Sequence, residues 1–250
     1  MITLYQFEIS PFCDKVRRIL HWKKQPYAVR EVPMKEAFTA VKKVNPIGKL
    51  PCLEHDGRFI ADSTDIAYYL ETQFPDPPLL PRDPKLRALC HIFEDWADES
   101  LYFYEMRLRF TVPHNARKHI PLLTAHDPAW MRTAAKLVVP RMMRGILDKQ
   151  GLGRKPLAMV VRDLERHLDA VSGWLGSGEW LVGDALSLAD LSVFAEFACI
   201  RDTEEGGRAF ETRPTVAAWM ARVAAATANH SALTRPPTVD PWRAPPRAAR

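Results

Sequence analysis

A proline-rich segment divides this sequence into two parts that follow different patterns. Residues 75–84 read PDPPLLPRDP. Proline lacks a backbone N–H and clashes with the preceding helical turn, so this segment cannot continue a helix and is interpreted as a linker. Strand and helix patterns alternate before it, and only helical patterns follow it. We therefore predict an α/β domain at residues 1–75, a linker at 76–84 and an all-helical domain at 85–232.

The first part has the pattern of a small mixed sheet with helices. In chain order, we expect a strand at 2–8, a helix at 11–24, a strand at 27–32, a helical stretch at 35–44, strands at 51–55 and 58–61, and a helix at 62–74. The turn Asp56-Gly57 joins the last two strands into a hairpin. An order of βαβ followed by ββα implies a sheet with both parallel and antiparallel pairs.

The second part has only helical periodicity. We expect helices at 85–110, 136–149, 157–175, 188–200 and 214–226, with a proline-broken stretch at 111–130. Ser187 to Asp190 read SLAD, the spacing of an N-terminal capping box with Asp in place of Glu. Apolar residues follow it, so we interpret this box as structural.

The formal charge of +5 gives little reason to expect a nucleic-acid partner. Residues 235–250 hold four arginines and one aspartate, so most of the excess positive charge lies in this terminal stretch. Basic residues elsewhere are interleaved with acidic ones rather than gathered in stripes. We predict that residues 233–250, rich in proline, alanine and arginine, are disordered.

The sequence predicts neither a membrane partner nor a metal site. No apolar run approaches the length needed to cross a bilayer, and the N-terminus opens into a strand pattern without signal-peptide features. The cysteines, Cys13, Cys52, Cys90 and Cys199, are scattered and suggest neither a disulfide framework nor a zinc cluster. A reducing compartment, the cytoplasm, is the expected location.

The start of the first predicted helix carries the most informative motif. Ser10 to Cys13 read SPFC, where a redox helix of glutaredoxin type would have Cys-Pro-aromatic-Cys. Serine therefore stands where the attacking sulfur would be. Ser10 also suits the N-cap position, and Pro11 suits the first helical position.

Four segments together resemble the cytosolic glutathione transferase superfamily over most of the chain. They are SPFCDKVR at 10–17, NPIGKLPCL at 45–53, ADSTDIAYYLE at 61–71 and EWLVGDALSLADLSVF at 179–194. The resemblance implies a thioredoxin-like N-terminal domain and an all-helical C-terminal domain. It also implies glutathione as the co-substrate.

The resemblance implies particular roles for a second group of residues. Leu50-Pro51 matches the family's cis-proline, and the backbone of Leu50 would pair with the cysteinyl part of glutathione. Asp62 and Ser63 match the acidic-Ser pair, in which a helix N-terminus favours the γ-glutamyl carboxylate and Asp62 attracts the ammonium group. Lys49 would lie near the glycyl end. The residues alone leave other interpretations open: Asp62 and Ser63 as a helix cap, and Lys49 as a solvated surface group.

The resemblance also assigns the chemistry. Ser10 falls where serine-type members, such as the tau and zeta classes, carry a catalytic hydroxyl that can donate a hydrogen bond to the glutathione thiolate. Cys13 is an alternative nucleophile because thiols in a first helical turn can have a low pKa, but it could equally be a small buried residue. Tyr5 is a further candidate hydroxyl, because some classes of the family use a tyrosine near the end of the first strand, but its position is too early for that role and a strand tyrosine is usually a core or rim residue.

A pocket for the electrophile should lie between the two domains. Its candidate residues are Phe12, Trp96, Tyr102, Tyr104 and Arg107. The region 112–153 is longer and more basic than in compact family members, and it is similar to the metaxin and failed-axon-connections branch.

Three functions follow from this resemblance. The leading hypothesis is an enzyme that activates glutathione for attack on a small, apolar electrophile. The alternatives are a glutathione-binding or interaction protein without conjugating activity, and a thiol–disulfide reductase that uses Cys13. Family members are usually homodimers, so we expect a homodimer.

Overall fold

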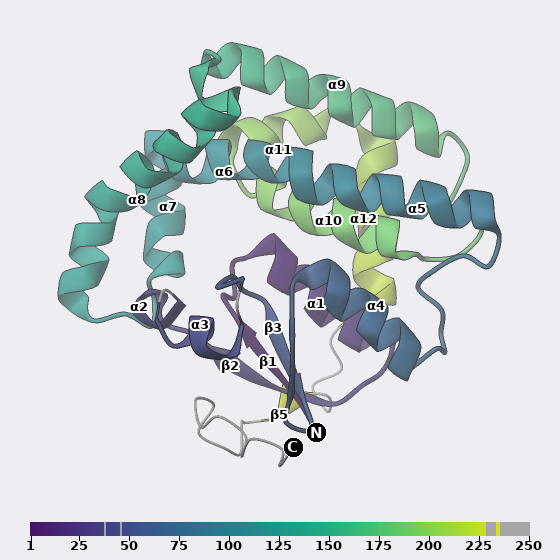
Figure 1. The fold of residues 1–250 in the computed structure, drawn as a ribbon. Coiled ribbons are helices and arrows are strands. Elements are labelled where there is room, and N and C mark those ends of the chain that lie inside the picture. The colour runs from purple at the N-terminus through teal and green to yellow at the C-terminus, as the bar shows by residue number, and fades with distance from the viewer. Residues whose placement is uncertain (38, 46, 229–233, 236–250) are drawn as a thin grey trace.

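The computed structural model describes residues 1–37, 39–45, 47–228 and 234–235. Figure 1 shows the sheet and its helices in the lower half, with most of the later helices stacked above. The elements of the first part are β1 (Ile2–Gln6), α1 (Pro11–Trp22), β2 (Tyr27–Glu31), α2 (Met34–Ala37), α3 (Val41–Val44), β3 (Cys52–His55), β4 (Arg58–Ala61) and α4 (Ser63–Gln73). The predicted strands and helices are present, and the helical stretch expected at 35–44 consists of two short helices.

The sheet is mixed, as predicted. Its strand order is β4-β3-β1-β2-β5, with β1 parallel to β2 and antiparallel to β3. Strand β1 is buried on both faces. Ile2 and Leu4 belong to the apolar cluster that includes α1 and α4, whereas Tyr5 packs with Val32 and Val41 on the opposite face. Successive side chains of a strand point to opposite faces, so one strand contributes to both clusters.

A short strand lies where the sequence predicts the start of a disordered tail. Residues Thr234–Arg235 form β5, which pairs in parallel with Tyr27 and Ala28 of β2. The prediction that residues 233–250 are disordered is therefore wrong at Thr234–Arg235, which form a strand. The rest of that segment, 236–250, lies outside the described residues.

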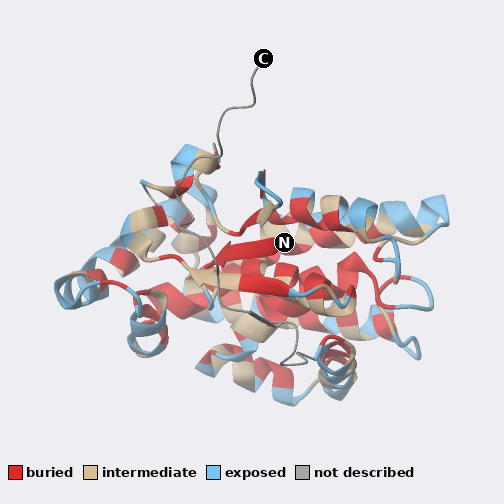
Figure 2. Ribbon diagram, turned by 90° about the horizontal axis from the view of Figure 1, so that it is seen from below, coloured by how far each residue is buried: buried red, intermediate tan, exposed pale blue. Residues whose placement is uncertain are grey.

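The second part is helical. Its elements are α5 (Pro84–Trp96), η1 (Ala97–Leu101), α6 (Tyr102–Thr111), α7 (Pro113–Leu123), α8 (Ala129–Gln150), η2 (Leu152–Arg154), α9 (Leu157–Leu175), α10 (Leu188–Arg201), α11 (Glu204–Glu211) and α12 (Pro214–Ala226). Within the described part of the chain, no helix combines the length and apolar character needed to cross a lipid bilayer. Figure 2 shows how burial concentrates in the sheet and in the helix segments packed around it.

The helix predicted at 85–110 is not a single regular α-helix. Residues Ala97–Leu101 form a π-helical turn between α5 and α6. An inserted π turn changes which side chains share a helix face, and such turns occur frequently at functional sites. No proline or glycine marks this position in the sequence, so periodicity alone gave no warning of it. Helix α8 also begins earlier than predicted, at Ala129 rather than 136, and accommodates Pro140 within it.

The predicted capping box at Ser187–Asp190 is present and buried. Asp190 accepts hydrogen bonds from the backbone N–H and hydroxyl of Ser187, from the backbone N–H of Leu181 and from the indole N–H of Trp219. These donors satisfy a carboxylate that would otherwise be costly to bury. The box therefore ties α10 to α12 and to the loop before it.

The two parts share one continuous apolar core. It runs from β1 and α1 through α10 to α12, and the central helix α10 is buried over most of its length. The linker is also fixed in place: Glu71 accepts from the backbone N–H of Leu79 and Leu80, and the carbonyl of Leu79 accepts from Leu188. The boundary between α/β and helical parts is therefore a packed interface.

Candidate active site

A cavity of about 470 Å³ lies where the first turn of α1, the loop before β3 and the start of α4 face helices α5 and α6. The proposed catalytic serine and the residues proposed to bind glutathione all contribute to its lining: Ser10, Phe12, Lys49, Leu50, Pro51, Asp62 and Ser63. These residues come from three separate segments of the first part of the chain. The fold thus gathers them around one space.

Ser10 lies at the N-cap of α1, as predicted. Its backbone is extended (φ −78°, ψ 129°), Pro11 occupies the first helical position, and the Ser10 carbonyl accepts from the backbone N–H of Asp14. The Ser10 side chain makes no capping hydrogen bond. A hydroxyl at this position lies at the positive end of a helix, where anions are stabilised.

The other two candidate nucleophiles are buried. Cys13 has 0% of its surface exposed, and burial raises the pKa of its thiol to about 11, although Arg17 and the Ser10 hydroxyl act in the opposite direction. A thiol with that pKa is almost entirely protonated at neutral pH. Tyr5 is a core residue whose hydroxyl donates to Glu54 at 2.8 Å. Burial and this bond raise the pKa of the Tyr5 hydroxyl above its usual value. Both therefore have the surroundings of packing residues.

A buried asparagine shapes the loop that precedes β3. The side-chain amide of Asn45 donates to the carbonyl of Lys49 at 2.6 Å, and its oxygen accepts from the backbone N–H of Ile47 at 2.9 Å. Gly48 has a φ of 67°, a left-handed conformation that glycine adopts without steric cost. The Leu50–Pro51 peptide bond is cis, as the resemblance implies. The bonds of Asn45 therefore fix the loop that carries Leu50 and Pro51, both of which line the cavity.

Asp62 both caps α4 and lines the cavity. Its carboxylate accepts from the backbone N–H of Thr64 at 2.8 Å and of Asp65 at 3.4 Å. Its φ of 70° is rare for a residue other than glycine, and such strained residues cluster at functional sites. The next residue, Ser63, is buried, and its hydroxyl donates to Asp98 at 3.4 Å.

Sequence reasoning missed a buried charged cluster beneath this pair. The Lys15 ammonium of α1 lies 2.9 Å from Glu94 of α5 and 2.6 Å from Asp98 of the π turn. Burial disfavours its charged form, but Asp98 and Glu94 together raise the pKa of Lys15. For Asp98, burial outweighs the attraction of Lys15 and raises the carboxyl pKa to about 6. A signal was available: Lys15 lies one helical turn before Ile19, on the face of α1 that should be buried.

The remaining walls of the cavity are largely apolar. They include Met34, Tyr102, Phe103, Phe110, Leu123, Met142 and Met143. The rings of Phe12 and Tyr102 have centroids 4.9 Å apart. The sequence also nominated Trp96, Tyr104 and Arg107, but these residues do not line the cavity. Trp96 and Tyr104 pack against His167, and Arg107 bonds to Thr111.

The long basic region at 112–153 forms α7, the following loop and α8. Met142 and Met143 of α8 reach the cavity, and Leu123 does so from α7. Asp127, in the loop between these helices, accepts from the backbone N–H of Met34 at 3.0 Å and of Lys35 at 3.3 Å. The region therefore shapes the cavity and is anchored to α2.

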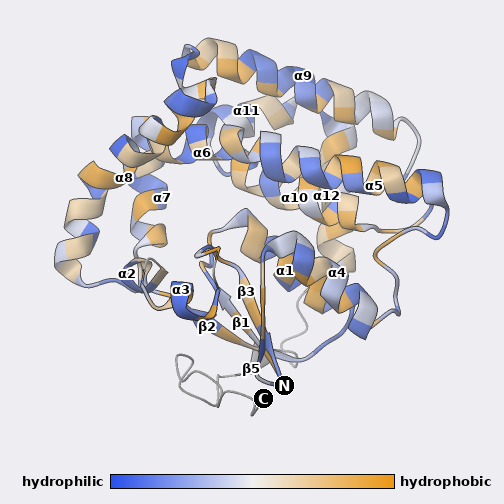
Figure 3. Cartoon of the chain, viewed as in Figure 1, coloured by the Kyte–Doolittle hydropathy of each residue, from blue (hydrophilic) through white to orange (hydrophobic). Residues whose placement is uncertain are grey.

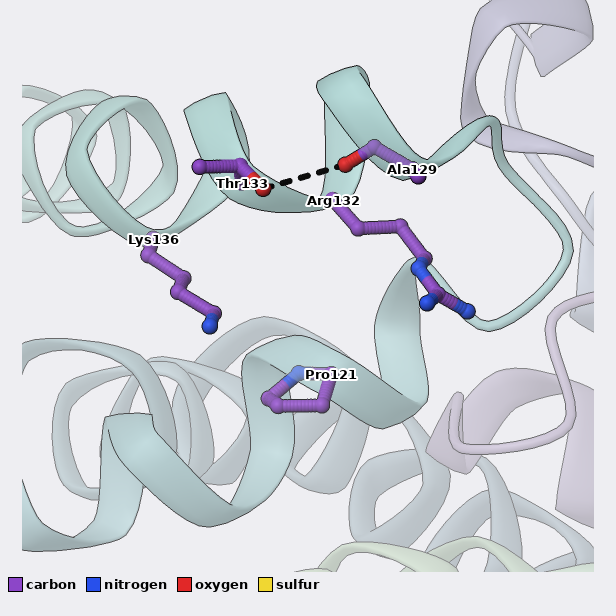
Figure 4. A pocket seen from close by; sticks show the side chains of 5 residues that line it. All are labelled: Pro121, Ala129, Arg132, Thr133 and Lys136. Atoms are coloured by element: carbon purple, nitrogen blue, oxygen red, sulfur yellow. Dashed lines mark hydrogen bonds between the residues drawn. The ribbon is translucent and has the colours of Figure 1, made fainter.

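A second cavity, of about 310 Å³, lies between α7 and α8. Figure 4 shows its residues: Pro121, Ala129, Arg132, Thr133 and Lys136. The hydroxyl of Thr133 is used within its own helix, where it donates to the carbonyl of Ala129. The side chains proposed from the sequence lie in the larger cavity and not here, so we take the larger one as the candidate active site.

Comparison with known proteins places this geometry in a family. Residues 4–78 match the glutathione S-transferase N-terminal domain, and residues 136–226 match the glutathione S-transferase C-terminal domain. A probable maleylacetoacetate isomerase of Caenorhabditis elegans is 39% identical over 193 residues, which cover 76% of this chain and 75% of the relative. FtsZ-localized protein A of Caulobacter vibrioides is 27% identical over 202 residues, which cover 79% of this chain and 76% of that protein.

Other relatives are matched over shorter stretches. Curated glutathione S-transferases of Dianthus caryophyllus and Arabidopsis thaliana align over less than half of their own length, 41% and 45%. Among solved structures, the beta-etherase LigF of Sphingobium superposes with a TM-score of 0.65 at 24% identity, over 90% of this chain and 95% of that one. This likeness supports the fold. The chain belongs to the glutathione S-transferase family.

Proposed function

We propose that this protein is a glutathione transferase that activates the glutathione thiol for attack on a small, apolar electrophile. The observation that carries the proposal is the position of Ser10. Ser10 lines a cavity at the positive end of α1, and the same cavity is lined by polar side chains from the start of α4 and from α5 and by apolar side chains from α6, α7 and α8. That division suits a charged tripeptide beside an apolar second substrate.

The polar side of the cavity suits the charged groups of glutathione. The carboxylates of Asp62 and Asp98 would attract the γ-glutamyl ammonium, and Ser63 with the N-terminal end of α4 would receive the γ-glutamyl carboxylate. Lys49, which is exposed at the rim, would attract the glycyl carboxylate. The backbone of Leu50 would pair with the cysteinyl residue.

Ser10 would then act on the sulfur. Its hydroxyl donates a hydrogen bond to the thiolate, and the dipole of α1 adds to the stabilisation, so the thiol ionises more easily and releases its proton to water. The thiolate forms a bond to the electrophilic carbon, and the electron pair of the bond that breaks leaves with the departing group or moves onto the substrate. The protein supplies no nucleophile of its own.

Two other functions remain as alternatives. A binding protein without conjugating activity is a specific possibility because one relative bears the name FtsZ-localized protein A. A reductase that uses Cys13 is disfavoured, because this thiol is buried and its pKa is raised to about 11. A cytoplasmic location is part of the proposal, and all four cysteines are free thiols.

The test of the proposed function has two steps. The protein should bind to immobilised glutathione and elute with free glutathione, and it should then accelerate conjugation of a generic aryl halide. Binding without turnover would favour the interaction protein over the enzyme. Reduction of a mixed disulfide that is abolished by Cys13→Ala would favour the reductase.

Glutathione binding should weaken at acidic pH because of Asp98. Its pKa of about 6 means that the carboxylate is ionised above pH 6 and protonated below it. Protonation removes the charge that attracts the ligand's ammonium group, so we expect the Kd to rise about fivefold or more between pH 7.5 and pH 5. In the Asp98→Asn variant, the glutathione Kd measured by titration calorimetry should not change with pH across this range. An equal pH dependence in that variant would contradict the assignment.

We also propose that the protein is a homodimer. Large apolar side chains are exposed on α5 and α8: Ile92 is 63% exposed, Trp130 72% and Leu137 64%. Figure 3 shows apolar residues along the outer side of α8. Exposed apolar surface of this kind commonly marks an interface. Light scattering after gel filtration should give about twice the chain's mass, and Trp130→Glu with Leu137→Glu should shift the protein toward monomer if α8 contributes.

A further inference from the structure

Two cations of α8 face the cavity of about 310 Å³ that lies outside the candidate active site. Arg132 and Lys136 line this cavity from α8, and Pro121 lines it from α7. Figure 4 shows both charged side chains extending from α8 into the space between the two helices. None of these three residues lines the larger cavity, so the space between α7 and α8 is a separate feature of the fold.

The two cations lie one helical turn apart on the same face of α8. Side chains at positions i and i+4 have Cβ atoms about 5–6 Å apart, and like charges at this spacing destabilise a helix. Among the residues that the structure describes, neither Arg132 nor Lys136 has a hydrogen-bond or ion-pair partner. The helix therefore holds two positive charges together at a cavity without a carboxylate that compensates them.

The other lining residues add no charge to this cavity. Those that the structure describes are Pro121, Ala129 and Thr133. The hydroxyl of Thr133 donates to the carbonyl of Ala129 at 3.1 Å, so its hydrogen is already used within the helix. A ligand in the cavity would therefore meet two charged donor groups and a largely apolar wall.

The charge of the surrounding segment also favours an anion. Residues 112–153 hold seven lysine and arginine residues and two aspartates, an excess of five positive charges that equals the formal charge of the whole chain. Asp127 is bonded to backbone N–H groups of α2. Asp148 lies about 18 Å further along the axis of α8 than Lys136. Neither aspartate therefore offsets the two cations of the cavity, and their field attracts negative charge.

A phosphate group suits two neighbouring cations better than a carboxylate does. A phosphomonoester carries a charge of about −1.5 to −2 at pH 7 and has three acceptor oxygens. The guanidinium of an arginine can donate to two phosphate oxygens side by side, and the ammonium of a lysine acts on a phosphate as a point charge. A carboxylate carries a single charge, so one of the two cations would stay uncompensated beside it.

We propose that the cavity between α7 and α8 is a binding site for the phosphate group of a phosphomonoester, held by Arg132 and Lys136. A soluble phosphorylated compound and the headgroup of phosphatidic acid both carry this group, and the test separates the two sources. The site does not include the proposed glutathione cavity. Phosphate binding here therefore does not depend on the proposed function, and its failure would leave that function untouched.

Inorganic phosphate is the first probe, and the amide NMR signals of residues 129–136 report its binding to the full chain. At an ionic strength of about 20 mM, where exposed charges are screened little, these signals should shift saturably. Arg132→Ala combined with Lys136→Ala should raise the Kd at least about tenfold, because both charges are lost. Arg132→Lys should raise it about threefold, since the charge stays and the paired donors are lost. Acetate should bind at least about tenfold more weakly than phosphate, and equal affinity for the two anions would overturn the proposal.

Arg141→Ala combined with Lys149→Ala is the matched control. It removes two positive charges from exposed positions of the same helix, but neither residue lines the cavity. This variant should keep the Kd for phosphate within about twofold of the wild-type value, because the solvent screens exposed charges. If the Kd rises equally in both double variants, only the net charge of α8 attracts phosphate, and the proposal is wrong.

Vesicles decide the source of the phosphate group. If free phosphate causes no saturable shift, the protein is sedimented with phosphatidylcholine vesicles that contain about 20% phosphatidic acid. Binding that Arg132→Ala with Lys136→Ala lowers at least about fivefold, and that the control variant keeps, would assign the site to the lipid headgroup. Binding of neither probe would overturn the proposal.

Circular dichroism checks that the double variants fold. If the variant of the cavity does not, acetylation of the wild-type protein by an activated ester decides. The probe that binds should protect Lys136 from acetylation more strongly than it protects Lys149, which lies on the same helix outside the cavity. Equal protection of the two lysines would contradict the proposed site.

Discussion

Ser10→Ala is expected to lower kcat/KM for conjugation by about 100-fold near pH 6.5. The hydroxyl at the start of α1 is the group proposed to stabilise the glutathione thiolate, and without it the pKa of the bound thiol should rise by about 2, equivalent to about 2.7 kcal/mol. The deficit should narrow above the thiol pKa, where thiolate forms without help. The measurements are a pH–rate profile and the ultraviolet absorbance of the bound thiolate.

Cys13→Ala is the matched control for this experiment. Cys13 lies one helical turn from Ser10 but is buried with a thiol pKa of about 11, so its removal should change kcat/KM by less than about threefold. The glutathione Kd of Ser10→Ala should stay close to the wild-type value, since the tripeptide is proposed to bind mainly through other residues. A loss of the same size at every pH, or no loss, would contradict the assigned role of Ser10.

Lys15→Met should lower the free energy of unfolding by about 3–5 kcal/mol. The Lys15 ammonium is 1% exposed and lies between the carboxylates of Glu94 and Asp98, in the interface between α1 and α5. Removing one partner of a buried ion pair leaves the other charges uncompensated in a low-dielectric environment, which is more costly than the loss of the bond itself. Urea denaturation followed by circular dichroism measures the effect.

Two further variants separate this effect from lost packing. Lys43→Met removes an exposed lysine and should change stability by less than about 0.5 kcal/mol. The double variant Lys15→Met with Glu94→Leu should be more stable than Lys15→Met alone, because it removes one of the stranded carboxylates. If Lys15→Met unfolds at the same urea concentration as the wild-type protein, the charged cluster does not hold the interface.

Much of the fold could be predicted because local signals agreed with one another. The hairpin around Asp56-Gly57, the N-cap at Ser10 and the capping box at Ser187–Asp190 are set by residues close in sequence, and the structure has each of them. The π turn at Ala97–Leu101 could not be predicted, because it changes the helix register without any proline or glycine to mark it. Helix α11 was missed as well, since it has only two turns.

The candidate site could be predicted only in part. Motifs that resemble a known family identified seven cavity residues among the first seventy-five positions, including Ser10 and Asp62, but not Met34 or Ala37. Asp98 and Arg109 were missed because they belong to helices whose sequence pattern indicates only which residues are apolar. Arg107 was nominated from the same helix in place of Arg109. Residues i and i+2 of an α-helix point about 200° apart around the helix axis, so an error of two residues selects the opposite face.

The sequence by itself determined where the chain changes from strands to helices, which residue begins α1, and that serine replaces cysteine there. These features depend on proline, capping residues and periodicity, which act over a few residues. Only the tertiary structure decided that Lys15 meets Glu94 and Asp98, and that Arg109 meets Ile9. Those contacts join residues 79 to 100 positions apart, and their strength comes from burial, which exists only once both parts have packed.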